Sequence, residues 1–383
     1  MMMKANNEEI GIYIHIPFCI SKCIYCDFVS VSNTTLIEKY FSYLLKEIEM
    51  YKEKIKGSKI LTIYLGGGTP SFVHEKNIVK IINKIKQYND LRDVVEFTIE
   101  VNPGTVSKEK FEVYKSIGIN RISMGLQSTD DLILKMLGRA HSYKEFLESY
   151  KLAREAGFDN ISVDLMFGLP NQSVDDFNES IDKVVELDPE HISAYSLKVE
   201  KNTKLYTMIE NGKLILPDEE IDRIMYNNLI DKAEKNGYYL YEISNFSKLG
   251  LKSIHNTLYW KRTQYIGLGL SAHGFLDDVR YGNEITFLNY FDKLDKLEKP
   301  IKDFDKIDFE DSLFEEIMLG LRLTKGINYK KIDEKYKINF IKKYKNEIIE
   351  LKNEEMIEIN GDYLSITKKG MSISNSIIVK FLN

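Results

Sequence analysis

The chain has 383 residues, of which 43% are hydrophobic and 29% are charged, and its formal net charge is −5 at pH 7. This composition is ordinary for a soluble globular protein, and the acidic balance gives no sign of a nucleic-acid or anionic-membrane surface. The sequence has no apolar run of transmembrane length, and residues 1–11 lack the apolar segment of a signal peptide. We therefore expect a cytoplasmic protein with two domains, or with one large α/β domain and additions.

From residue 11 to residue 197, short apolar runs alternate with segments of helical periodicity. The predicted strands are residues 12–16, 60–65, 94–101, 121–126, 161–167 and 191–197. Strands that alternate with helices indicate a parallel sheet covered by helices. Six such units predict a partial, open (β/α)6 barrel of the TIM type, and ligands of such barrels bind at the carboxyl ends of the strands.

The loop after the first predicted strand carries all three cysteines, Cys19, Cys23 and Cys26, in a C-x3-C-x2-C spacing. Three thiolates on one short loop can hold three corners of a 4Fe-4S cubane and leave the fourth iron open. This spacing is the signature of radical S-adenosylmethionine (SAM) proteins. In these proteins the amino and carboxylate groups of SAM chelate the open iron, and an electron from the cluster breaks the sulfonium carbon–sulfur bond.

Two other interpretations of the cysteines are weaker. A zinc site would need a fourth ligand such as His15 to close a tetrahedron. A disulfide would leave one of the three thiols over. We therefore expect an iron–sulfur cluster.

Polar or flexible residues stand at the ends of the other predicted strands, on the same face as the cysteines. The second strand runs into the glycine-rich segment 66–70, where missing side chains let a ligand approach the backbone. Glu100 and Gln127 end the next two strands, Arg139 follows a helix, and Asp164 interrupts a very apolar strand. Each residue alone could make an ordinary structural hydrogen bond or ion pair. Together they favour a bound polar ligand.

After residue 197 the alternation of strands and helices fades. Residues 238–246 are predicted as one further strand. The next segment is His255-Asn256-Thr257-Leu258-Tyr259-Trp260. In one interpretation the neutral histidine ligates haem iron and the flanking aromatic side chains cover the macrocycle. In the other, the segment is a polar turn that seals the barrel edge. The glycine-rich segment 266–274 indicates close packing beside the barrel mouth, and its His273 is a second candidate haem ligand.

From residue 309 the pattern becomes helix, helix, hairpin, helix, which resembles a small winged-helix module of α+β type. Asn360-Gly361 predicts a type I′ turn in the hairpin. Residues 309–383 carry 13 Lys or Arg and 12 Asp or Glu, a net charge of +1. A DNA-reading module usually has a basic stripe, so we expect a docking or substrate-covering module and no nucleic-acid partner.

Over most of its length the chain resembles the HemN/HemW branch of the radical SAM superfamily. The resemblance is carried by the motifs around the cysteines and at the strand ends, which are residues 13–19, 66–70, 100–103, 121–127 and 164–170. The resemblance implies that Cys19, Cys23 and Cys26 hold the 4Fe-4S cluster. The SAM site that it implies is formed by Tyr13, Tyr25, Gly67, Gly68, Thr69, Glu100, Gln127, Arg139 and Asp164.

Within this SAM site the resemblance implies separate roles. Tyr13 and Tyr25 would border the cofactor, and Gly67, Gly68 and Thr69 would receive its methionine end through backbone groups. Glu100 would lie against the cofactor. Gln127 and Asp164 would bind the ribose hydroxyls, and Arg139 would pair with the SAM carboxylate.

The H-N-x-x-Y-W string at residues 255–260 is typical of the haem-chaperone subgroup of this branch. It implies a protein that binds haem through His255, carries a SAM-ligated cluster, and transfers haem to an acceptor protein. The alternatives are an oxygen-independent coproporphyrinogen III dehydrogenase and another HemN-like radical SAM enzyme.

Two departures favour the chaperone. Sequences of the dehydrogenase type have a further cysteine after the third cluster ligand, whereas Cys26 is followed here by Asp27-Phe28, and they have a long amino-terminal extension, whereas here the cluster loop starts at Cys19. We therefore expect no coproporphyrinogen III dehydrogenase activity.

We expect three domains, which are a radical SAM barrel at residues 1–200, an extension at 201–305 and the winged-helix-like module at 306–383. The expected partners are haem, a haem-acceptor protein and an electron donor for the cluster. An exposed barrel edge would also permit a homodimer.

Overall fold

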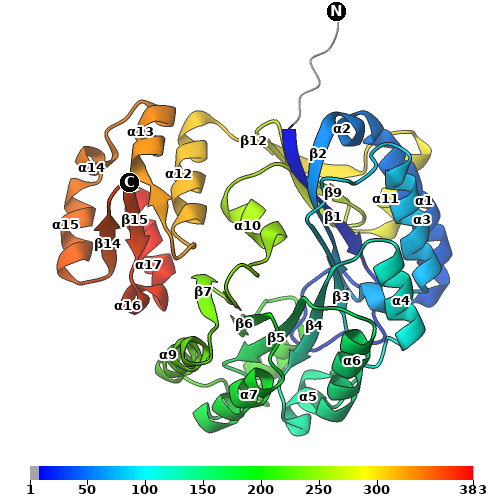
Figure 1. Ribbon diagram of the computed structural model, residues 1–383, viewed down its shortest axis with the longest axis horizontal. Coiled ribbons are helices and arrows are strands. Elements are labelled where there is room, and N and C mark those ends of the chain that lie inside the picture. Colours follow the sequence, from blue (N-terminus) through cyan, green and yellow to red (C-terminus); the bar gives the residue numbers. More distant parts are fainter. Residues whose placement is uncertain (1–7, 383) are drawn as a thin grey trace, which may run out of the picture.

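The computed structural model describes residues 8–382 and is built around one twelve-stranded sheet (Figure 1). The strand order is β12-β11-β10-β9-β1-β2-β3-β4-β5-β6-β8-β7. Strands β1 to β6 pair in parallel in sequence order, which confirms the predicted partial barrel. Their bounds are β1 (Glu8–Ile16), β2 (Ser58–Gly67), β3 (Glu96–Val101), β4 (Arg121–Gln127), β5 (Ile161–Phe167) and β6 (His191–Ser196).

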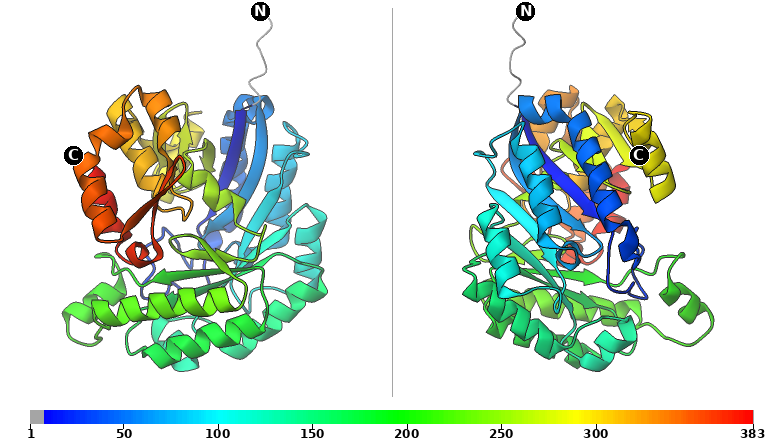
Figure 2. Two further views of the ribbon diagram at one scale, coloured as in Figure 1. Left: turned by 60° about the vertical axis from the view of Figure 1, so that its left-hand side comes forward. Right: turned by 90° about the vertical axis from the view of Figure 1, so that its right-hand side faces the viewer.

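Helices cover the outer face of these strands (Figure 2). Buried isoleucines at alternate positions of β1, namely Ile10, Ile12, Ile14 and Ile16, face this outer layer. A capping box formed by Ser142 and Glu145 starts one of the helices. The layer consists of η1 (Thr34–Leu36), α1 (Ile37–Met50), α2 (Lys52–Gly57), η2 (Pro70–Phe72), α3 (Glu75–Lys86), α4 (Lys108–Ser116), α5 (Asp131–Leu137), α6 (Tyr143–Glu155) and α7 (Val174–Glu186).

The next segment extends both edges of the barrel sheet. The single strand predicted at residues 238–246 is wrong, because the chain turns back after Glu242 and forms an antiparallel pair that continues from β6. On the other edge β9 pairs in parallel with β1. The elements are α8 (Lys204–Glu210), α9 (Glu219–Lys235), β7 (Tyr239–Glu242), β8 (Asn245–Ser247), α10 (Ile254–Trp260), β9 (Tyr265–Leu268), β10 (His273–Leu276), β11 (Val279–Asn283), α11 (Phe287–Asp295) and β12 (Ile301–Lys306).

The last segment is a small α+β module beside the barrel (Figure 1). Its sheet has the order β13-β15-β14. The predicted hairpin is present, but Gly361-Asp362 form its loop and only Gly361 has a positive φ, so the predicted type I′ turn is wrong. The elements are α12 (Phe309–Gly320), β13 (Ile327–Asn328), α13 (Tyr329–Tyr336), α14 (Phe340–Lys343), α15 (Lys345–Asn353), β14 (Ile357–Asn360), β15 (Tyr363–Ile366), α16 (Lys368–Met371), α17 (Ser374–Val379) and η3 (Lys380–Leu382).

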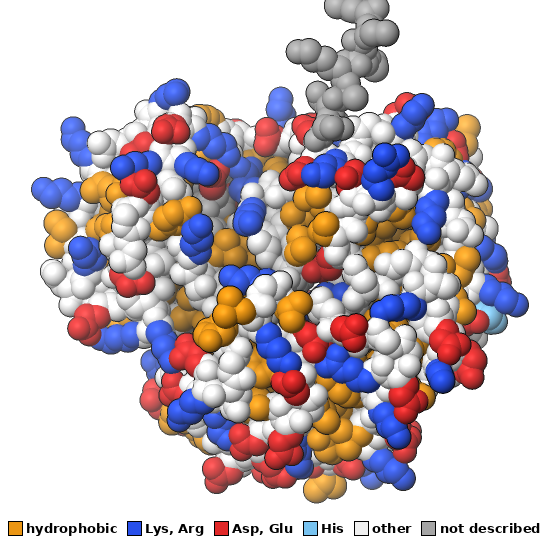
Figure 3. Space-filling view, in the orientation of Figure 1, with side chains coloured by type: hydrophobic (Ala, Val, Ile, Leu, Met, Phe, Trp, Pro, Cys, Tyr) orange, Lys and Arg blue, Asp and Glu red, His pale blue; other side chains and the backbone are white. Residues whose placement is uncertain are grey.

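Acidic and basic side chains are interspersed over the face shown in Figure 3. Within residues 8–382, no helix combines the length and the apolar character needed to cross a membrane.

Helix α10, which contains the H-N-x-x-Y-W string, lies inside the opening of the barrel (Figure 1). The expectation of a polar turn at the barrel edge is therefore wrong. The buried Glu96 at the start of β3 accepts hydrogen bonds from Ile254 N at 2.6 Å, His255 N at 3.0 Å and Ser253 Oγ at 3.2 Å. These groups form the N-terminus of α10, where free N–H groups and the helix dipole favour a carboxylate.

We predict that Glu96→Ala destabilises the protein by roughly 2–3 kcal/mol, because it leaves buried N–H groups of α10 without an acceptor. Thermal unfolding of the purified chain measures the effect. Glu148→Ala is the matched control, since that carboxylate is exposed on α6. Equal unfolding temperatures for the two variants would contradict the anchoring role of Glu96.

Candidate functional site

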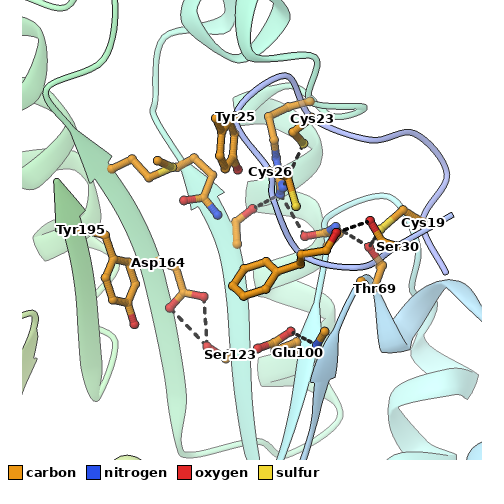
Figure 4. A pocket seen from close by; sticks show the side chains of 18 of the residues that line it. Cys19, Cys23, Tyr25, Cys26, Ser30, Thr69, Glu100, Ser123, Asp164 and Tyr195 are labelled. Atoms are coloured by element: carbon orange, nitrogen blue, oxygen red, sulfur yellow. Dashed lines mark hydrogen bonds between the residues drawn. The ribbon is translucent and has the colours of Figure 1, made fainter. Parts of the chain in front are cut away.

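A cavity of about 460 Å³ opens at the carboxyl ends of the barrel strands (Figure 4). It gathers residues from the loop after β1, from the ends of β2, β3 and β4, from the loop after α5 and from within β5. The predicted site residues that line it are Cys19, Cys23, Tyr25, Cys26, Gly67, Gly68, Thr69, Glu100, Gln127, Arg139 and Asp164. The structure thus brings together side chains that are far apart in the sequence.

Backbone hydrogen bonds hold the cysteine loop over this cavity. Cys19 N donates to Val31 O at 3.0 Å, and Ile24 N donates to Leu137 O at 3.0 Å. The side chains of Thr69 and Arg139 lie against sulfur atoms, with Thr69 Oγ1 at 3.5 Å from Cys19 Sγ and Arg139 Nη1 at 3.9 Å from Cys23 Sγ. All three cysteines are free thiols and line the cavity.

The donor set fits a cluster better than a single metal ion. Among residues 8–382, no three Cys, His, Asp or Glu side chains converge closely enough to share one ion, as a zinc site requires. A cubane instead presents separate iron atoms to separate thiolates. Burial raises the pKa of the Cys26 thiol to about 11 and also raises that of Cys19, so iron would displace protons on binding.

The suggested fourth zinc ligand, His15, is engaged elsewhere. Its Nε2 bonds Val29 O at 2.9 Å and its Nδ1 lies 3.0 Å from the Tyr13 hydroxyl. Burial lowers its pKa to about 4, which keeps the ring neutral near pH 7. Its ring thus supports the loop that follows the cysteines.

The glycines at the end of β2 are required because this backbone packs directly on the end of β1. A Cβ at Gly67, where φ is +113°, would lie 2.5 Å from the His15 ring, and a Cβ at Gly68 would lie 2.9 Å from Ile16 O. Gly68 N donates to Ile16 O at 2.9 Å, and Thr69 N donates to Phe18 O at 2.8 Å. The glycine segment and the cysteine loop therefore pack directly against each other.

Glu100 faces the cavity from the end of β3. It accepts hydrogen bonds from Gly67 N at 3.0 Å and from the Tyr64 hydroxyl at 2.9 Å. Burial raises its pKa to about 7 despite these bonds, and the charge of Asp164 acts in the same direction. The carboxyl can therefore exchange a proton near neutral pH.

Arg139 is part of a polar chain that connects three strand ends. Its Nη2 donates to Gly125 O at 2.6 Å and to Asn102 Oδ1 at 2.9 Å. Asn102 Nδ2 in turn donates to Thr69 Oγ1 at 2.7 Å. The guanidinium is thus held beside Cys23, where it can receive an anionic group.

Asp164 stands on the opposite wall (Figure 4). It accepts hydrogen bonds from Ser123 Oγ at 3.0 and 3.2 Å and from Ser162 Oγ at 3.3 Å. Burial raises its pKa. The carboxylate oxygens still border the cavity, so they can accept hydrogen bonds from ligand hydroxyl groups.

Tyr25 adds an apolar wall next to the cysteines. It packs against a small cluster formed by Ile133, Leu137, Met166 and Leu169. Met166 itself lines the cavity. Tyr25 and Met166 thus give the cavity an apolar surface against which a flat ring of a ligand can lie.

Tyr13, in contrast, faces a second cavity of about 520 Å³. Its ring stacks on Tyr64 with centroids 6.1 Å apart, and Tyr64 lines the first cavity. The structure therefore places Tyr13 behind the wall of the predicted SAM site, and its role beside SAM stays a prediction.

His255 lies in the barrel interior and is 1% exposed. Its ring nitrogens lie 2.7 Å from Thr62 Oγ1 and 2.7 Å from the Tyr259 hydroxyl. Burial lowers its pKa to about 3, so the imidazole is neutral. Ligation of haem by His255 would require the ring to give up one of these bonds and to leave this position.

The sequence did not assign roles to several residues that line the first cavity, which are Tyr64, Arg121, Ser193, Tyr195 and Asn256. Arg121 is 2% exposed, and its Nε has no hydrogen-bond partner among the described residues. A charged residue at the start of an apolar strand was a signal for it. Tyr64 and Asn256 gave no such signal: Tyr64 is one of several side chains of β2, and only the insertion of α10 brings Asn256 to the cavity.

Comparisons with known proteins agree with this geometry. Residues 13–184 match the Radical SAM superfamily, and residues 307–373 match the HemN C-terminal domain. The chain is 36% identical to Heme chaperone HemW of Bacillus subtilis, over 97% of this chain and 98% of that protein. It is 35% identical to Heme chaperone HemW of Lactococcus lactis, over 100% of this chain and 98% of that protein.

A solved structure shares the fold. The radical SAM enzyme coproporphyrinogen III oxidase (HemN) from Escherichia coli superimposes with a TM-score of 0.85 at 19% identity, covering 99% of this chain and 91% of that one. At this identity the likeness concerns the fold alone.

We predict that, in the metal-free protein, the free energy of unfolding of Glu100→Gln increases relative to that of the wild type as pH rises from about 4.5 to about 7. The increase is roughly 3 kcal/mol at most. The folded carboxyl keeps its proton to pH about 7, whereas the unfolded one loses it near 4.5. Stability from this group therefore falls over that interval, and glutamine cannot ionise.

Unfolding temperatures of wild type and variant, measured across this pH range, test the prediction. Glu148→Gln serves as the exposed control. A difference between Glu100→Gln and wild type that does not change with pH would contradict the raised pKa.

Proposed function

We propose that this chain, which belongs to the HemW family of radical SAM proteins, is a haem chaperone that carries a SAM-ligated 4Fe-4S cluster and transfers haem to an acceptor protein. The observation that carries the proposal is the similarity, over nearly the full length of both chains, to proteins of that name. The two cavities at the barrel opening supply space for the ligands.

In this proposal Cys19, Cys23 and Cys26 hold three irons of the cluster, and the fourth iron is left for SAM. A bound cluster supplies one electron for cleavage of the sulfonium carbon–sulfur bond. Thr69 and Arg139 keep the thiols in place through their contacts with Cys19 and Cys23. The polar chain through Asn102 orients both of these side chains.

The same cavity is proposed to hold SAM. The backbone of Gly67, Gly68 and Thr69 receives the methionine end, and Arg139 pairs with the carboxylate. Asp164 and Gln127 accept hydrogen bonds from the ribose hydroxyls. Tyr25 and the apolar cluster behind it contact the adenine. Glu100 orients the glycine segment through its hydrogen bond from Gly67 N.

The proposed partners are haem, a haem-acceptor protein and an electron donor. A homodimer formed through the edges of the six-stranded barrel would meet an obstacle. Strands β9 and β8 already cover the edges of β1 and β6. A dimer would need another surface.

We predict that Cys23→Ala, reconstituted anaerobically with iron and sulfide, loses the brown chromophore and most of its bound iron, because two thiolates cannot hold the cubane. Visible absorption and iron analysis measure the loss. Ser21→Ala is the matched control, since Ser21 is exposed on the same loop. A full cluster in Cys23→Ala would overturn the assignment.

We predict that the reconstituted wild type binds haem saturably and does not convert coproporphyrinogen III at a catalytic rate in the presence of SAM and a reductant. Haem titration by visible absorption and product analysis measure the two activities. Catalytic conversion would replace the chaperone with a coproporphyrinogen III dehydrogenase. This outcome would show that the activity does not need a fourth cysteine after Cys26, where this chain has Asp27-Phe28.

A further inference from the structure

The second cavity, defined by its lining residues from β1, the loop after the cysteines, α10, β9 to β11 and α12, has no role in the SAM site. Its volume of about 520 Å³ lies within the range of cofactor pockets, roughly 300–1,000 Å³. It is adjacent to the first cavity, because Asp27 and Phe28 line both.

One side of this cavity is aromatic. Tyr259 and Tyr265 meet at a centroid distance of 4.7 Å, Phe275 lies beside them on β10, and Leu319 from α12 closes the wall. Such side chains give a flat apolar ligand a large contact area. The cavity therefore suits a planar macrocycle.

Two arginines that line the cavity can bind the negatively charged groups of a ligand. Arg262 and Arg280 share the single carboxylate of Glu315, with Arg262 Nε at 3.1 Å and Arg280 Nη2 at 3.2 Å from Oε2. Both guanidiniums also lie over the Phe275 ring, at 5.4 and 5.7 Å from its centroid. These three side chains carry a net charge of +1 on this side of the cavity, and the carboxylate of Asp27 also lines it.

Arg262 has unused hydrogen-bonding capacity. Its side chain is only 7% exposed, and its buried Nη2 has no partner among the described residues. A buried donor without an acceptor is costly, and a small shift of the Arg262 side chain toward the cavity would let a bound carboxylate satisfy this nitrogen, which is closed to solvent as it stands. The geometry therefore favours a ligand that carries carboxylates on an apolar ring.

The cavity also contains a histidine that is open to a ligand. His273 at the start of β10 is exposed and lines the cavity. A Cβ at Gly282 on β11 would approach its Cε1 to 3.0 Å, so the glycine makes room for the imidazole. The other two histidines near the cavity, His15 and His255, have both ring nitrogens within hydrogen-bond distance of a partner.

We propose that this second cavity is the haem-binding site, with His273 as an axial ligand of the iron and with Arg262 and Arg280 as partners of the propionate carboxylates. This inference rests on the proposed haem-chaperone function. It gives the H-N-x-x-Y-W string an indirect part in haem binding, because Tyr259 supplies a cavity wall and His255 holds Tyr259 through a hydrogen bond of 2.7 Å.

The test is a haem titration, followed by visible absorption, of the full-length protein and three histidine variants. His273→Ala is expected to change the Soret band and to weaken haem binding roughly tenfold or more. His74→Ala, a variant of an exposed histidine on another surface, is expected to match the wild type. Added imidazole should restore the ligated spectrum in His273→Gly.

A second arm tests the arginines and keeps the proposal falsifiable if the histidine variants do not fold. The Arg280 side chain is 39% exposed, so Arg280→Gln is the tolerable change. The wild type should bind haem dimethyl ester roughly tenfold less tightly than haem, and Arg280→Gln should reduce this difference. The affinity for metal-free protoporphyrin should fall in Arg280→Gln and should be unchanged in His273→Ala.

The outcomes separate this inference from the proposed function. Failure of the wild type to bind haem would remove the chaperone function itself. Haem binding by the wild type with the same spectrum and affinity in His273→Ala, or with no loss for the ester, would overturn this cavity as the site and leave the chaperone function standing.

Discussion

The interior of the barrel depends on one buried carboxylate. Glu96 accepts hydrogen bonds from the N-terminus of α10 and so holds a short helix inside an otherwise open barrel. A short helix has little stability of its own, and the carboxylate satisfies N–H groups that water cannot reach. The positions of His255, Asn256 and Tyr259 all follow from this one interaction.

Because α10 is inserted, the space at the barrel opening is divided into two cavities. The division is an aromatic wall in which Tyr64 stacks on both Tyr13 and His255, at 6.1 and 5.0 Å. The H-N-x-x-Y-W string is therefore first a structural element that builds this wall. Asp27 and Phe28 line both cavities.

The first cavity shows how a polar site is prepared within an apolar barrel. Glu100 and Asp164 are buried with raised pKa values, and Arg121 and Arg139 contribute cationic charge close by. Each of these groups pays a desolvation cost, which hydrogen bonds from neighbouring strands only partly offset. A polar cofactor with carboxylate, amino and hydroxyl groups matches what remains unsatisfied.

The sequence by itself determined the six parallel strands, the cysteine loop and the side chains that meet at the strand ends, because strand periodicity and motif position are local properties. Only the tertiary structure decided the place of residues 255–260, the separation of Tyr13 from the first cavity and the turn within residues 238–246. These features depend on contacts between distant segments, such as Ser253 with Glu96 across 157 residues. The cavity at His273 arises in the same way, because β10, β11, α10 and α12 must first pack together before its arginines and aromatic rings face one another.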